Sequence, residues 1–181
     1  MHFPIALSLI ALLAACTSEP RTPSPPLVGP SPPPAPPASR PVVAAPRGAE
    51  WQDWPLTPGT WAWRGDGRSS TALFGPAGGD ALFLARCDRA TRAVILARQG
   101  SLGLGQSAKM QIRASSGLRD YPAANTWDAT PYVGARLASA DSHLDAITYT
   151  RGRFLVSVTG MADLVIPAAP EFNRIVEDCR G

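Results

Sequence analysis

The sequence is poor in the residues on which most metal centres depend. Its 181 residues include only two histidines and three cysteines. Only one histidine, His143, lies beyond the first few positions. Because a zinc site takes three or four nitrogen, sulfur or oxygen ligands, we expect no metal site and no cofactor.

Common catalytic motifs are missing as well. The sequence has no His-Glu-x-x-His, no Gly-x-Ser-x-Gly and no phosphate-binding loop ending in Gly-Lys-Ser/Thr. The only lysine, Lys109, follows Gln106 by three residues, so a Ser-x-x-Lys dyad is also missing. This favours a non-enzymatic protein. A hydrolase that uses two carboxylates stays open as the alternative. Its candidate residues are Asp128, Asp141 and Asp163.

Charge is scarce and nearly balanced. Charged residues make up 17% of the chain, and the formal net charge is +3. Within residues 48–181 the basic and acidic residues almost cancel. Binding to nucleic acid needs a concentrated basic face, so we expect no nucleic-acid partner.

The N-terminus lacks a hydrophobic run long enough to span a membrane. Ile5–Leu13 is an apolar stretch of nine residues, whereas a spanning helix needs about 20. Such a stretch is typical of the hydrophobic region of an export signal. It ends in Leu13-Ala14-Ala15-Cys16, which resembles the lipobox of bacterial lipoproteins.

This resemblance implies where in the cell the protein is located. A lipoprotein signal peptidase would remove residues 1–15, and Cys16 would become the lipidated first residue. In Gram-negative families Thr17 at the next position favours the outer membrane, facing the periplasm or the cell surface. Residues 1–4 depart from the pattern because they contain no Lys or Arg. An ordinary secretory signal is therefore the alternative.

Residues 16–47 are dominated by proline. Twelve of the 20 prolines lie between Pro20 and Pro46. Proline fixes φ and removes a backbone donor, so such a segment forms polyproline II or stays disordered. We predict a stalk that separates the anchor from a compact domain formed by residues 48–181.

The pattern within residues 48–181 predicts a mainly β (α+β) fold. Short apolar and β-branched segments alternate with Gly-rich and Pro-rich turns. This spacing favours a small antiparallel β-sandwich or barrel over βαβ units. The predicted strands are Thr60–Arg64, Thr71–Phe74, Ala81–Cys87, Ala93–Arg98, Met110–Ala114, Tyr132–Leu137, Phe154–Thr159 and Leu164–Ile166.

Two helices are predicted near the C-terminus. Ser142 and Asp145 have the spacing of a capping box, which starts a short helix with Leu144 and Ile147 facing inward. A second helix begins at Pro170 and closes the β domain. Its apolar residues follow helical spacing. They are Phe172, Ile175, Val176 and Cys179.

Cysteine usage predicts one disulfide. If Cys16 is lipidated, Cys87 and Cys179 remain as an even pair in an exported protein. Cys179 lies on the apolar stripe of the last helix, and Cys87 ends a strand. We predict that their disulfide ties the helix to the sheet.

Two sets of residues are candidate binding sites. Trp61 and Trp63 would share one face of a strand and form an aromatic platform for sugars or proline-rich partners. Alternatively, they belong to a core strand under an N-terminal flap. Arg151 and Arg153, with Arg136 nearby, could clamp a phosphate or carboxylate, or simply flank a strand in solvent.

The C-terminal third looks like that of small uncharacterised exported proteins of Gram-negative bacteria. The resemblance rests on Arg151–Phe154, Leu164–Pro167 and Glu177–Arg180, and it implies no activity. The sequence as a whole favours a lipid-anchored envelope protein with a binding domain. Its expected partner is another envelope protein or, second, the cell-wall glycan. An envelope hydrolase or a small-ligand binder is the alternative.

Overall fold

The computed structural model describes residues 50–126 and 129–181. The predicted signal peptide, the lipidated Cys16, the stalk and Asp128 lie outside the described residues. The described part of the chain contains nine strands, two α-helices and one short 3-10 helix. The strands are β1 (Thr60–Gly65), β2 (Ser69–Gly75), β3 (Phe83–Asp88), β4 (Ala93–Gln99), β5 (Ala108–Ala114), β6 (Gly117–Thr126), β7 (Tyr132–Ala138), β8 (Arg153–Val158) and β9 (Leu164–Pro167). The helices are η1 (Trp51–Asp53), α1 (Ser142–Thr148) and α2 (Pro170–Arg180).

All nine strands form one sheet with antiparallel neighbours, in the order β1-β2-β3-β4-β7-β6-β5-β8-β9. The two ends of this order meet. The amide of Thr57 donates to the Val165 carbonyl, and the Val165 amide donates to Thr57 Oγ1, both at 2.9 Å. Trp61 Nε1 on β1 also donates to the Pro167 carbonyl on β9, at 2.9 Å. A single sheet with joined ends is closer to the predicted barrel than to the sandwich.

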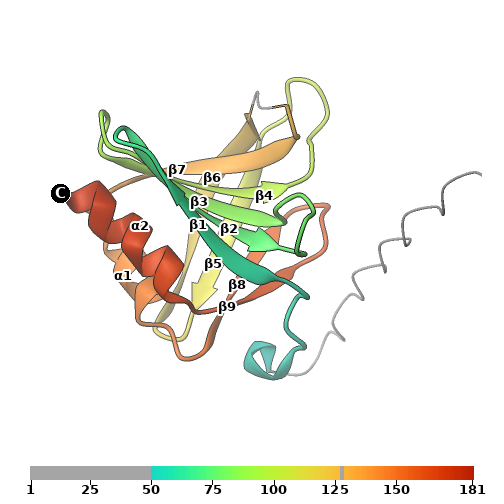
Figure 1. The fold of residues 1–181 in the computed structure, drawn as a ribbon. Helices are drawn as coiled ribbons and strands as arrows, with labels where there is room; N and C mark the ends of the chain where they lie inside the picture. The colour runs from blue at the N-terminus through green and yellow to red at the C-terminus, as the bar shows by residue number, and fades with distance from the viewer. Residues whose placement is uncertain (1–49, 127–128) are drawn as a thin grey trace, which may run out of the picture. The chain divides into compact units, whose positions relative to one another are not determined.

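The two α-helices lie on the inner side of the curved sheet (Figure 1). α2 packs against β1–β4, and α1 packs against β5, β6 and α2. Aromatic rings fill the space between helix and sheet. Phe83, Phe154 and Phe172 are fully buried, and the ring of Phe154 contacts the rings of the other two. The predicted mainly β fold with a C-terminal helix is confirmed. No helix in residues 50–126 and 129–181 has the length and hydrophobicity needed to cross a membrane.

The predicted capping box of the first helix is wrong. The N-cap of α1 is Asp141, whose carboxylate accepts a 2.8 Å hydrogen bond from the amide of His143. Ser142 is the first helical residue and is exposed. Asp145 instead accepts from Arg180 Nη1 at 2.6 Å. An Asp immediately before the helix is an equally good cap, so the boundary moves by one residue.

Candidate functional site

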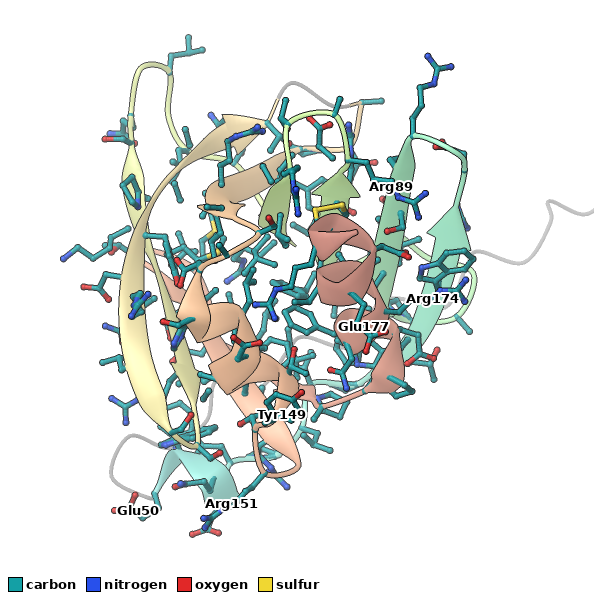
Figure 2. All side chains as sticks on the ribbon, turned by 90° about the vertical axis from the view of Figure 1, so that its left-hand side faces the viewer. Glu50, Arg89, Tyr149, Arg151, Arg174 and Glu177 are labelled. Carbon is teal, nitrogen blue, oxygen red and sulfur yellow. A yellow bond between two sulfur atoms is a disulfide. The ribbon has the colours of Figure 1, made fainter. Side chains whose placement is uncertain are left out.

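The predicted cysteine pair lies at disulfide distance. The sulfur atoms of Cys87 on β3 and Cys179 on α2 are 2.18 Å apart, and their Cα atoms are 5.3 Å apart. Figure 2 shows this sulfur–sulfur bond beside the last turn of α2. Both residues are buried. The bond therefore fixes the C-terminal helix to β3.

Trp61 and Trp63 face the core side of β1. The Trp61 ring contacts Phe74, Phe83 and Phe172, with ring centroids 5.4 to 6.5 Å apart. The Trp63 ring is covered by the guanidinium of Arg174, whose Cζ lies 3.6 Å from the ring centroid. This contact is a cation–π interaction between α2 and β1. The packing favours the core-strand interpretation of both tryptophans over a sugar platform.

The segment before β1 forms the N-terminal flap. Trp51 in η1 is buried against Leu155 and Val165 on the outer side of β8 and β9, with Trp54 beside it. Arg153 Nη1 donates to the Trp54 carbonyl at 2.6 Å. Arg153 therefore serves to hold the flap.

The arginine clamp predicted around Arg151 is not assembled. Arg151 is exposed, and its backbone amide donates to Ser115 Oγ at 3.1 Å. The guanidinium of Arg153 is engaged by the flap. Arg136 lies on β7, which is separated from β8 by β6 and β5 in the sheet. The structure does not bring these three guanidinium groups together.

His143 belongs to a small polar network under α1. Its ring is buried, and Nε2 donates to the Ile112 carbonyl at 3.1 Å. Burial lowers the pKa of His143 below its usual 6.5, and the Arg119 guanidinium acts in the same direction. Asp141 accepts from Arg119 Nη1 at 2.7 Å and from the Tyr121 hydroxyl at 3.2 Å. Burial, together with the charge of Asp141, raises the pKa of Tyr121 to about 12.

The candidate carboxylates of a hydrolase are not brought together. Asp141 follows β7 and caps α1, whereas Asp163 precedes β9, which is separated from β7 by β6, β5 and β8 in the strand order. Burial lowers the pKa of Arg98, and the charge of the nearby Asp163 opposes this shift in part. Within the described residues no group of three or more His, Cys, Asp or Glu side chains could hold a metal ion.

A group of exposed arginines is the feature that sequence reasoning missed. The register aligns Arg64 on β1 with Thr71 on β2 and then Arg86 on β3. It continues through Ile95 on β4 to Arg136 on β7. Side chains alternate along a strand, and the neighbours of these residues face the core. The three arginines therefore form a row across the outer face of the sheet.

Beside this row lies a surface hollow of about 640 Å³. Two turns form it, one before β2 and one after β3. It is lined by Asp66, Gly67, Arg68, Ser69, Arg86, Asp88, Arg89 and Ala90. We call Arg64, Arg68, Arg86 and Arg136 the arginine surface.

Comparison with known proteins identifies no relative. No protein-family model, no curated protein and no solved structure matches this chain.

Proposed function

We propose that this protein is a lipid-anchored component of the bacterial cell envelope whose β domain binds another envelope component. The anchor is Cys16, the stalk is residues 16–47, and the binding module is residues 48–181. The proposal assigns the chain a non-enzymatic task.

The observation that carries the proposal is the position of Cys87 and Cys179. Disulfides persist in oxidising compartments outside the cytoplasm and are rare inside it. Two buried cysteines at disulfide distance, one on α2 and one on β3, support export of the chain. The lipobox at Leu13–Cys16 then supports a membrane anchor. Each methylene buried in the bilayer adds about 0.8 kcal/mol to the free energy of membrane binding. One acyl chain gives only marginal attachment, whereas three acyl chains would attach the protein stably.

The packing of the domain supports a binding role rather than a cavity for small ligands. Four phenylalanines fill the space inside the sheet and are fully buried. Binding would then occur on the outer surface. The four are Phe74, Phe83, Phe154 and Phe172.

The experiment is expression of the full chain in a Gram-negative host with a labelled fatty acid. We expect label on the mature chain and recovery in the membrane fraction. The matched control is Cys16→Ser, which should carry no label. Recovery of an unlabelled, processed wild-type chain in the soluble fraction would contradict the anchor.

A further inference from the structure

We propose that the arginine surface binds a linear anionic polysaccharide. This inference rests on the proposed function, since it names the envelope partner of the same domain. It is carried by four guanidinium groups that form no ion pair and no side-chain hydrogen bond within the described residues.

Most other cations of the described residues have partners inside the molecule. Four ion pairs involve Arg89, Lys109, Arg119 and Arg180. Three further guanidinium groups donate to backbone carbonyls, and Arg174 covers Trp63. By contrast, the arginine surface contributes to none of these ion pairs or side-chain hydrogen bonds among the described residues.

The regular spacing of the arginines in the row suits a ligand with regularly spaced negative charges. Neighbouring strands lie about 4.8 Å apart, so Arg64, Arg86 and Arg136 leave the sheet about 10 Å apart on alternate strands. Thr71 and Ile95, which lie between them, are half-buried, so their side chains do not project between the arginines. Each guanidinium offers a fork of donors that fits a carboxylate, phosphate or sulfate group.

The two carboxylates at the hollow are engaged locally. Asp66 accepts from the amides of Arg68 and Ser69 at 2.8 and 2.7 Å, and these bonds lower its pKa. Hydrogen bonds from Thr91 and the amide of Ala90 lower the pKa of Asp88. Both stay ionised in their own turns. The charges of Arg68 and Arg136 also lower the pKa values of Asp66 and Asp88, respectively. Four arginines against two carboxylates still leave the surface positive.

The apolar side chains of this face, among them Leu73, Leu84 and Ile95, are only half-exposed, and this low apolar content favours one class of partner. The exposed large hydrophobic residues of the described chain all lie away from β1–β4 and β7. Protein interfaces, membrane-surface patches and single-strand nucleic-acid sites use aromatic or apolar contacts. An anionic polysaccharide offers charges and hydroxyls, which guanidinium groups can bind without aromatic or apolar contacts. The exposed residues are Leu56, Leu104, Leu118 and Tyr149.

The test is titration of the purified full chain, in detergent, with polygalacturonate and with dextran sulfate. Neutral dextran is the ligand control. We expect binding to at least one anionic polymer that weakens as salt screens the charges. The variant Arg86→Gln/Arg136→Gln should bind at least about tenfold more weakly.

The matched variant is Lys109→Gln/Arg151→Gln, which removes the same charge from two exposed residues elsewhere. Its affinity should stay within about twofold of the wild type. Circular dichroism verifies that both variants are folded.

Three results would overturn the inference: equal binding to neutral dextran, equal loss in both variants, or no binding to either anionic polymer. Arginine-dependent binding to vesicles with anionic lipid, in place of the polymers, would assign the surface to a membrane instead. None of these results depends on lipidation of Cys16. Failure of this inference is therefore distinguishable from failure of the proposed function.

Discussion

At the scale of single residues, His143 combines burial with a titratable group. It lies on the buried face of α1, near Tyr121, Asp141 and Arg119. Within the described residues, the only hydrogen bond of its ring is the one that Nε2 donates to the Ile112 carbonyl. Burial and the Arg119 charge disfavour the protonated imidazole, and together they outweigh the opposite effects of Asp141 and the Ile112 carbonyl. The folded state therefore favours the neutral ring.

This predicts a loss of stability at mildly acidic pH. The folded pKa of His143 lies below its usual 6.5, so the unfolded chain binds the proton first. The stabilisation is complete above pH 6.5, and it falls as the pH drops through the unfolded and then the folded pKa. Urea unfolding at a series of pH values should show this decline.

The control for that prediction is His143→Gln, which keeps a donor for Ile112 but does not titrate. Its unfolding free energy should be flat over the same range above the carboxylate pKa values. If the variant and the wild type show the same pH dependence, His143 is not the responsible group.

At the scale of secondary-structure elements, the link between α2 and β3 is the strongest constraint. Cys87 and Cys179 are separated by 92 residues. Closing a loop of that length stabilises the fold by roughly 4 to 5 kcal/mol in the chain-entropy model. We expect Cys87→Ala/Cys179→Ala to lower the unfolding free energy by up to about this amount.

Urea unfolding with and without reductant measures the effect, and the double variant should not respond to reductant. Thiol titration of the denatured, unreduced chain is the independent check. Reaction of the Cys87 and Cys179 thiols there would show that the disulfide does not form.

The sequence predicts eight of the nine strands, and the strand it misses has a physical reason. β6 (Gly117–Thr126) is exposed over its first four residues, and only Tyr121 and Ala123 are buried. Its N-terminal half pairs with β5 alone, since pairing with β7 begins at Ala123. Pro122 lies just outside that pairing, where a missing amide is tolerated. The apolar alternation that identifies other strands is therefore absent.

The candidate binding surface could not be predicted for a different reason. Arg64, Arg86 and Arg136 are far apart in the sequence, and none lies in a basic run. They meet only because the register places them across β1, β3 and β7. Pairing of strands that are distant in the chain is set by the whole sheet. Neither the local pattern of apolar residues nor the net charge predicts this pairing.

At the scale of the whole molecule, the sheet is closed by a segment outside its strands. The flap places Trp51 against Leu155 and Val165, and Thr57 shares two hydrogen bonds with Val165. These contacts join the beginning of the described chain to its last strand. The flap therefore determines whether the two ends of the sheet stay together.

We expect Trp51→Ala to destabilise the protein by about 3 kcal/mol, because it empties a buried aromatic site. The matched control is Gln52→Ala, an exposed neighbour in η1, with an effect within about 0.5 kcal/mol. Amide exchange distinguishes closure from general loss of stability. In Trp51→Ala the Val165 amide should exchange faster than the amides of β3 and β4, since the cover is lost from β8 and β9 and not from β3 and β4. A uniform change over all strands would mean that the flap does not close the sheet.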